Sequence, residues 1–280
     1  VSTDAVFKRS VAPDVVPSAS ARLEGWRGER VSAQLLLWTA SGADGVEVEV
    51  GPFKSDGYTL PGDAAQARFV RYVLSDEFGN KCGYHDPAIS PPHLVPDMLD
   101  DIDVFDIEAR NVRPVWITVS VPADAPAGEY VSTVKLYAKG RQLRTFDIGL
   151  TVIGRELPPP AEWNYYLDLW QHPAAVARVE GLDMWSDAHF EALVPYMRLL
   201  ADAGQKVVTT TLNKDPWNNQ CFDSYADMIV WTKNADGAWS YDYTVFDRWV
   251  ELMTGLGIDH TINCYSMLPW NNELHYRDGV

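Results

Sequence analysis

The chain has 280 residues, of which 46% are hydrophobic and 22% are charged, and it carries a formal net charge of −16 at pH 7. This length is sufficient for two domains with cores of their own, and no run of 18 or more apolar residues encodes a membrane span. The acidic balance argues against nucleic acid as a partner, because a phosphate backbone requires a basic surface.

The first part of the chain, residues 1–157, is predicted to be a β-sandwich domain. It contains no convincing helix and at least six runs that are apolar or alternate with period two, as strands do. These runs are 31–38, 46–50, 69–74, 115–121, 130–137 and 146–153. The Pro- and Gly-rich segment 122–129 predicts a turn that pairs the two runs on either side of it as antiparallel neighbours. Residues 79–106, with four prolines, are expected to form a long irregular loop.

A break at Gly154 and Pro158-Pro159-Pro160 separates this part from residues 158–280, where strands and helices alternate. The predicted strands are 164–170, 206–212 and 260–267. One predicted helix begins at the N-cap Ser186 and ends at Gly204, with Pro195 expected to kink it or restart it. A second helix is capped by Thr244 and closed by Gly257, and a hairpin is expected around 234–237, within an insertion that spans 213–243.

This alternation predicts parallel βαβ units, and hence an α/β domain behind the sandwich. No GxGxxG or Walker A motif follows a strand, so nucleotide-binding folds lose support. Long insertions at the carboxyl ends of the strands fit a (β/α)8 barrel, of which three strands are present. We therefore expect an incomplete (β/α)8 barrel, completed by missing sequence or by another chain.

The three predicted strand ends combine aromatic rings with hydrogen-bonding side chains. Sugars need this combination, because a ring covers their C–H face while polar groups bind the hydroxyls. The second half holds 8 of the 11 tryptophans and is strongly acidic, which suits a neutral or polar ligand, although solubility alone would also explain the charge. The candidate substrate-binding residues are Asp168, Trp170, His172, Asn213, Trp217 and Tyr265.

Each candidate also has a structural interpretation. Asp168 contacts substrate or pairs with a neighbouring strand, since a buried charge needs a partner. His172 binds a hydroxyl, orients another group or is a loop residue. Trp170, Trp217 and Trp270 bind ligand or have a structural role. Trp163, Trp185 and Trp249 are expected to be core or interface residues.

Cofactors and metal ions are not expected. The three cysteines, Cys82, Cys221 and Cys264, are odd in number and have no CxxC spacing, so they predict neither a disulfide framework nor a zinc site. Cys264 is expected to be a small buried hydrophobic residue. The chain begins at Val1, as a processed secretory protein or a trimmed chain would, and we expect it in a secreted, periplasmic or cell-surface location.

With these residues in view, the chain resembles family 123 of the glycoside hydrolases, the β-N-acetylgalactosaminidases. The resemblance covers nearly the whole chain. It rests on Phe7-Lys-Arg-Ser-Val-Ala-Pro13, Gly25-Trp-Arg-Gly-Glu-Arg-Val-Ser-Ala-Gln34, Pro122-Ala-Asp-Ala-Pro-Ala-Gly-Glu-Tyr130 and Asp168-Leu-Trp-Gln-His-Pro173. It implies a β-sandwich followed by a catalytic (β/α)8 barrel. It also implies a glycan or glycoconjugate substrate, from which terminal β-linked N-acetylgalactosamine is released with retention, assisted by the substrate's own acetamido group.

The family's catalytic pair is an adjacent Asp-Glu at a later barrel strand, and no such pair occurs in residues 154–280. Asp76-Glu77 belongs to the sandwich part and is not a candidate. We therefore expect the pair beyond Val280, assign no catalytic residue in this chain and expect the chain alone to be inactive. Two alternatives stay open, namely a non-catalytic carbohydrate-binding or scaffolding module and another retaining exo-glycosidase.

Overall fold

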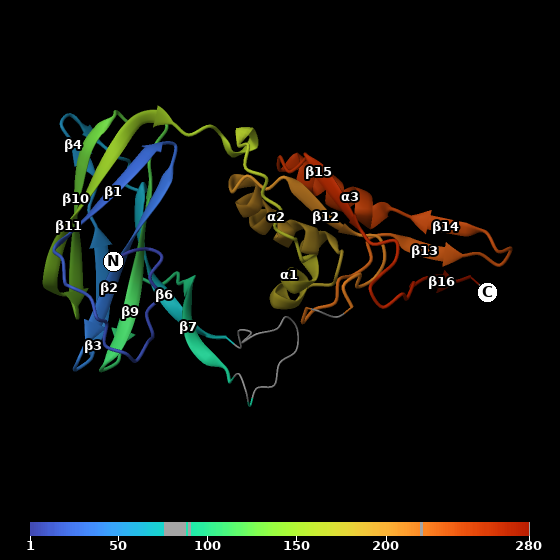
Figure 1. Cartoon of the computed structure of the whole chain (residues 1–280), viewed down its shortest axis with the longest axis horizontal. Coiled ribbons are helices and arrows are strands. Elements are labelled where there is room, and N and C mark those ends of the chain that lie inside the picture. Colours follow the sequence, from blue (N-terminus) through green and yellow to red (C-terminus); the bar gives the residue numbers. More distant parts are fainter. Residues whose placement is uncertain (76–87, 89–90, 219–220, 280) are drawn as a thin grey trace. The chain divides into compact units, whose positions relative to one another are not determined.

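The computed structural model describes residues 1–75, 88, 91–218 and 221–279 (Figure 1). Cys82 and Asp76-Glu77 lie outside the described residues. The chain divides into two compact units, Val1–Leu157 and Pro158–Val280. None of the helices in the described parts is both long and apolar enough to cross a bilayer.

The first unit consists of two β-sheets packed on one another. One sheet has the order β1 (Ser20–Arg27), β11 (Arg141–Glu156), β10 (Gly128–Ala138), β3 (Ala43–Val50) and β8 (Val104–Ile107), with the short strands β4 (Lys54–Ser55) and β5 (Tyr58–Thr59) beside β10. The other has the order β2 (Arg30–Thr39), β9 (Asn111–Ser120), β6 (Ala65–Ser75) and β7 (His93–Leu99). Buried side chains from both sheets form one core, among them Val134 and Ile148 from the first and Phe69 and Ile117 from the second.

All six predicted strands of this unit are present, as β2, β3, β6, β9, β10 and β11. The expected irregular loop at 79–106 is wrong in part, because β7 and β8 lie within it. Three of its prolines, Pro91, Pro92 and Pro96, do not prevent this: two precede β7, and Pro96 lies inside a strand that pairs only with β6 in the described part.

The predicted antiparallel pairing of 115–121 with 130–137 is also wrong. β9 pairs with β2 and β6, whereas β10 pairs with β11 and β3 in the opposite sheet. The segment between them passes from one sheet to the other, and its own residue Ala125 is fully buried. The hydroxyl of Tyr130 donates to the carbonyl of Pro126 at 2.7 Å and holds this corner closed. The Pro-rich signal therefore marks a change of sheet instead of a hairpin.

In its described residues, the second unit has a small parallel sheet and three α-helices. The sheet is β12 (Val207–Thr211) beside β15 (Thr261–Tyr265), and the helices are α1 (Pro173–Glu180), α2 (Asp187–Asp202) and α3 (Thr244–Gly255), with a 3-10 turn η1 (Pro160–Glu162). A separate sheet has the order β14 (Trp239–Asp242), β13 (Val230–Lys233) and β16 (Arg277–Asp278). The core lies where α2 and α3 cover β12, with Leu193, Trp249 and Met253 fully buried.

The sequence signals for helices agree only in part with the helices of the structure. The Ser186 cap is confirmed, since its hydroxyl accepts from the backbone N–H of His189 at 3.2 Å. α2 continues through Pro195, so the expected restart does not occur. Thr244 is the first residue of α3 and not its cap; the Asp242 carboxylate accepts from its backbone N–H at 2.9 Å instead. The hairpin around 234–237 is present as β13 and β14, and α1 was not predicted.

The predicted strand 164–170 is reduced to a single bridge, in which Leu167 pairs parallel to Gln205. Beyond that bridge, glutamine side chains take the place of the strand's backbone ladder. The Gln205 side chain accepts from the N–H of Leu169 at 2.9 Å and donates to the Val207 carbonyl at 2.8 Å. The Gln171 side chain accepts from the N–H of Thr209 at 2.7 Å. Since side-chain amides satisfy the buried backbone here, the segment stays beside β12 without strand geometry.

Cys264 is exposed, contrary to the expectation of burial. It lies on β15, which in the described residues has β12 as its only strand partner. The neighbouring Ile262 is also exposed, at 43%.

Candidate functional site

Three of the predicted aromatic residues meet in the second unit. The rings of Trp170 and Trp217 stack with centroids 4.8 Å apart, and Tyr265 lies 5.2 Å from the first ring and 4.9 Å from the second. Tyr265 is the last residue of β15, while Trp217 follows β12 and Trp170 follows the bridge at Leu167. The parallel arrangement explains the meeting, because the carboxyl ends of parallel strands share one edge.

Two further rings complete what we call the aromatic cluster: Trp170, His172, Trp217, Tyr225 and Tyr265. The His172 ring stacks on Tyr225 at 3.9 Å, and Tyr225 lies edge-on to Trp217 at 4.5 Å. Tyr225 was missed by sequence reasoning. It lies in the irregular insertion after β12, where no periodicity marks which side chains turn inward.

The rings of the cluster differ in exposure, and this decides what each can do. Trp217 is buried, at 5% exposure, whereas Trp170 is half exposed at 50%. Trp217 therefore supports the arrangement from below, and Trp170 presents a free ring face. A half-exposed indole on a buried aromatic support is a suitable surface for the apolar face of a ligand ring.

Burial also affects the titration of the cluster. It raises the pKa of Tyr225 to about 12, with smaller contributions from Cys221 and Asp215. It lowers the pKa of His172, an effect that the nearby Asp223 carboxylate opposes. His172 is therefore neutral at pH 7, and its buried Nε2 has no hydrogen-bond partner in the described part of the chain.

Asp168 lies beside the cluster with unused hydrogen-bonding capacity. Its Oδ2 accepts from the side-chain amide of Asn263 on β15 at 3.4 Å, which is long for such a bond. Its Oδ1 is buried and has no partner among the described residues. The Asp168 charge, after burial, raises the pKa of Tyr265. Asp168 is thus tied weakly to a neighbouring strand and keeps one oxygen available for a donor.

The side chain of Asn213 bonds to the protein backbone. Its side-chain N–H donates to the carbonyl of His275 at 2.8 Å, and its oxygen accepts from the N–H of the same residue at 2.8 Å. The side chain is buried, and both of its polar groups are engaged. Its effect is to hold the segment around His275 against the end of β12.

Trp270 follows β15, and its side chain is mostly exposed, at 64%. Its backbone N–H donates to the carbonyl of Pro216 at 3.0 Å. Trp249 is buried in the core, and Trp163 donates from its indole to the Pro158 carbonyl at 2.6 Å. Trp185 packs against the same core as Trp249.

Within the described residues, no three His, Cys, Asp or Glu side chains gather in a way that could hold a metal ion.

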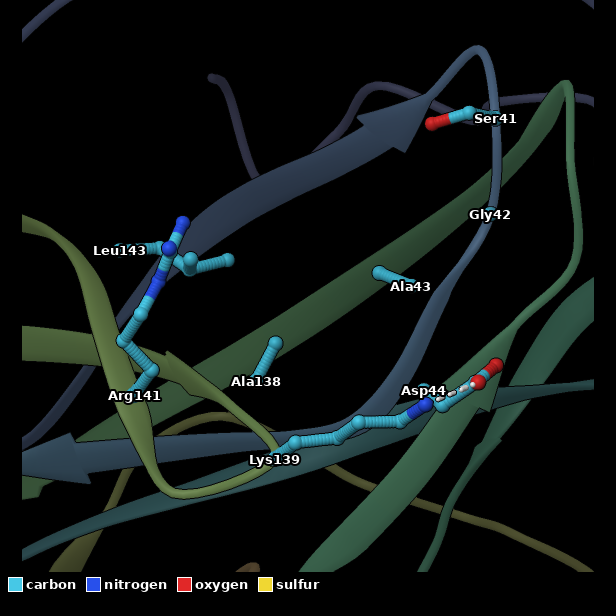
Figure 2. Close-up of a pocket in the computed structure, with 8 residues that line it drawn as sticks. All are labelled: Ser41, Gly42, Ala43, Asp44, Ala138, Lys139, Arg141 and Leu143. Atoms are coloured by element: carbon cyan, nitrogen blue, oxygen red, sulfur yellow. Dashed lines mark ion pairs between the residues drawn. The ribbon is translucent and has the colours of Figure 1, made fainter.

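The first unit contains a hollow of about 530 Å³ that differs in character from the cluster (Figure 2). It lies between the turn that precedes β3 and the turn that joins β10 to β11. Lys139 and Asp44 pair across it at 2.8 Å, and no aromatic ring is among its described lining residues. It therefore offers no surface of the kind that the cluster presents.

Comparisons with known proteins point to one enzyme family. A sequence profile described as the glycoside hydrolase 123 catalytic domain matches residues 170–279, and one described as the glycoside hydrolase 123 N-terminal domain matches residues 1–138. No curated protein sequence matches the chain.

Among solved structures, a family 123 glycoside hydrolase from Clostridium perfringens, studied for glycolipid glycan hydrolysis, has 26% sequence identity and a TM-score of 0.86. The match covers 94% of this chain and 47% of that one, so the chain spans about half the length of that enzyme. A PapD-like domain of human CEP192 has 14% identity and a TM-score of 0.29, covering 56% of this chain and 99% of its own. The superposition with the latter is too poor to bear on function.

Proposed function

The chain belongs to glycoside hydrolase family 123, and from this premise we propose that it is part of a glycosidase whose sugar site includes the aromatic cluster. The observation that carries the proposal is the half-exposed ring of Trp170, stacked on Trp217 beside the Oδ1 of Asp168, which has no hydrogen-bond partner among the described residues. A ring face next to a buried hydrogen-bond acceptor is what a sugar ring with its hydroxyl or amide N–H groups requires.

We further propose that the second unit is the first part of a (β/α)8 barrel. The parallel pairing of β12 with β15, and the bridge at Leu167, support this arrangement. The cluster then lies at the carboxyl ends of the strands, where barrels bind their ligands. The remaining strands and the catalytic Asp-Glu pair are assigned to sequence outside residues 1–280 or to another chain. The protein with its barrel completed is called the complete enzyme below.

For specificity, we propose release of terminal β-linked N-acetylgalactosamine with retention, by the substrate-assisted route. In that route the acetamido carbonyl attacks C1, so the protein supplies an acid for the leaving oxygen and a carboxylate that orients the amide N–H. The acetamido group needs a tight, water-excluding pocket beneath the sugar ring. Trp170 and Tyr265 are assigned to its walls, with Trp217 packed behind them, and Asp168 and His172 to contacts with sugar hydroxyls. Asn213 is assigned an indirect role, through the segment it holds.

The test uses two matched aryl glycosides and one inhibitor. The complete enzyme is expected to hydrolyse an aryl β-N-acetylgalactosaminide and to fail on the analogue with a 2-hydroxyl in place of the acetamide. A thiazoline that mimics the cyclic intermediate is expected to inhibit it. Equal rates on the two glycosides would rule out the mechanism and favour a protein carboxylate as nucleophile, that is, another retaining exo-glycosidase.

A second candidate function is a non-catalytic sugar-binding module. It is favoured by one observation, the lack of an Asp-Glu pair in residues 154–280. The two candidates differ in one measurement. A binding module retains a glycan without turnover even when the barrel is complete, whereas a glycosidase releases the terminal sugar.

A further inference from the structure

The sheet β14-β13-β16 carries an aromatic surface that is separate from the cluster. β13 and β14 pair so that Trp231 lies opposite Tyr241 and Lys233 opposite Trp239. Since side chains alternate along a strand, these four share one face. Tyr276, just before β16, lies edge-on to Trp239 at 5.2 Å, and Trp231 lies edge-on to Tyr241 at 5.3 Å. We call Trp231, Trp239, Tyr241 and Tyr276 the hairpin surface.

Three of these four rings are substantially exposed. Trp239 is 44% exposed, Tyr241 46% and Tyr276 49%. Trp231 is half-buried, and its indole N–H donates to the carbonyl of Leu212, directly after β12, at 2.8 Å. The hairpin projects away from the three helices of this unit (Figure 1). A group of large exposed aromatic rings on a projecting sheet marks a binding surface more often than chance.

The hairpin surface is linked to the candidate sugar site by one stretch of chain, residues 270–279. At its start, the N–H of Trp270 donates to the carbonyl of Pro216, next to Trp217. In its middle, the Asn213 side chain holds the backbone of His275. At its end, the N–H of Gly279 donates to the carbonyl of Lys233 on β13 at 2.9 Å. The same stretch therefore contacts the loop that carries Trp217 and forms an edge of the hairpin surface.

The chemistry of the surface fits neutral sugar rings better than a lipid headgroup. Tyr and Trp offer ring faces for C–H groups together with hydroxyl and indole N–H groups at their edges. Lys233 is the one cation of the four residues paired in this face, and Asp278 is next to it in the register of β16. The second half of the chain carries 8 Lys/Arg against 18 Asp/Glu, which repels an anionic membrane surface.

We propose that the hairpin surface binds the sugar units on the leaving-group side of a neutral oligosaccharide whose terminal unit occupies the aromatic cluster. This inference rests on the proposed function for the position of the terminal sugar. It assigns Trp239 and Tyr276 to contacts with sugar units that are not themselves cleaved. The surface then discriminates between long and short substrates, because a small aryl glycoside does not reach it.

The test compares a neutral oligosaccharide with an aryl glycoside of the same terminal sugar, in the complete enzyme carrying Trp239→Ala or Tyr276→Ala. The expected result is a rise in KM for the oligosaccharide of about three- to tenfold over any rise for the aryl glycoside, the range for losing one aromatic contact. Trp239→Phe is expected to restore most of the affinity. Trp38→Ala is the matched control, since Trp38 is also 44% exposed but lies on β2 of the first unit.

Binding of the intact oligosaccharide to a catalytically silent preparation is measured in parallel by calorimetry. If the wild-type protein hydrolyses neither substrate but binds the oligosaccharide through Trp239, the proposed function fails, and what stands is oligosaccharide binding at the hairpin surface. Equal effects of Trp239→Ala on both substrates, or an equal effect of Trp38→Ala, overturn the inference. The inference is also overturned if Trp239→Ala abolishes the binding that the wild-type protein shows to neutral or anionic phospholipid vesicles and leaves the KM for the oligosaccharide unchanged. That result would make the surface a membrane contact.

Discussion

The ring of Trp170 stacks on the ring of Trp217 with 4.8 Å between centroids and 27° between planes. The two residues are far apart in the chain and follow different elements, so their contact joins two loops at one edge of the β12–β15 sheet. Because Trp217 is buried and Trp170 is half exposed, the pair has one supporting ring and one open ring. Substitutions at the two positions should therefore have different consequences.

Trp170→Ala in the complete enzyme is expected to weaken substrate binding by about 1–3 kcal/mol while the fold stays intact, because the open ring face is lost. Trp217→Ala is expected to weaken binding and also to lower the free energy of unfolding by about 3–5 kcal/mol, since it leaves a cavity under the cluster. Kinetics on an aryl glycoside and chemical denaturation measure the two effects.

Trp38→Ala serves as the control for exposure and size, because Trp38 is 44% exposed in the first unit. It is expected to change neither quantity beyond about 0.5 kcal/mol. Unchanged kinetics in both the Trp170 and the Trp217 variants, with the fold intact, would show that these rings do not contact substrate.

The purified chain of residues 1–280, free of any other chain, is expected to show no hydrolysis of an aryl β-N-acetylgalactosaminide. Residues 154–280 contain no Asp-Glu pair, and β15 leaves one strand edge unpaired in the described part of the chain. The second unit should also unfold at a lower temperature than the first, because the open edge of β15 leaves backbone groups without a strand partner among the described residues and the apolar side chain of Ile262 is exposed. Calorimetry and a chromogenic assay test both statements; turnover by this chain would refute the first.

Acid is expected to destabilise the second unit through His172. Burial lowers its pKa in the folded state below 6.5, so the unfolded state binds the proton more readily. The contribution of this residue to stability is therefore intact above about pH 6.5, the unfolded pKa, and is lost as the pH falls from there towards the folded pKa.

Denaturation of the wild type and of His172→Gln across pH 5–8 measures this effect. The variant should show a flatter dependence of unfolding free energy on pH. His260→Gln is the comparison, since the His260 ring is exposed. Identical pH dependence in the wild type and in His172→Gln would show that another group is responsible.

Gln205→Leu is expected to lower the free energy of unfolding by about 1–3 kcal/mol, the cost of leaving buried backbone groups without partners. Its side chain bonds to both backbone groups of Leu169 and to the carbonyl of Val207. Because Leu169 directly precedes Trp170, the variant should also weaken substrate binding. Gln142→Leu, at an exposed position of β11, is the control and should do neither.

The strands of the sandwich were accessible from sequence because alternation of side chains reports which face of a strand is buried. Alternation does not report which strand lies next to which, and so the pairing of β9 with β10 was wrong. In the second unit, the Ser186 cap and the apolar spacing of α2 were sufficient to locate that helix. The strand expected at 164–170 is absent for another reason. Its backbone, at Leu169, bonds to the side chain of Gln205 and not to the backbone of a neighbouring strand.

The sequence could indicate part of the candidate site, because the carboxyl ends of parallel strands lie at one edge of a sheet. Trp170, Trp217 and Tyr265 could be grouped because each lies at the end of a parallel strand or just after a strand or bridge. Tyr225 lies in an insertion without a repeating pattern, so nothing in the sequence indicated that its ring would face His172. Nor could the residue type of Asn213 reveal that its partner is the backbone of His275, 62 positions later.

The parallel pairing of β1 with β11 bears on how the first unit is made. Ser20 lies opposite Asp147 and Gly25 opposite Val152, so β1 finds its neighbour only at the far end of the unit. Such pairing raises the contact order, that is, the mean sequence separation of contacting residues. A high contact order slows folding, because closing a long loop costs chain entropy before the contact is made. During synthesis, β1 stays without its partner until β11 has left the ribosome. The β2–β9 pair of the opposite sheet can form before that point, because both strands precede β11 in the chain.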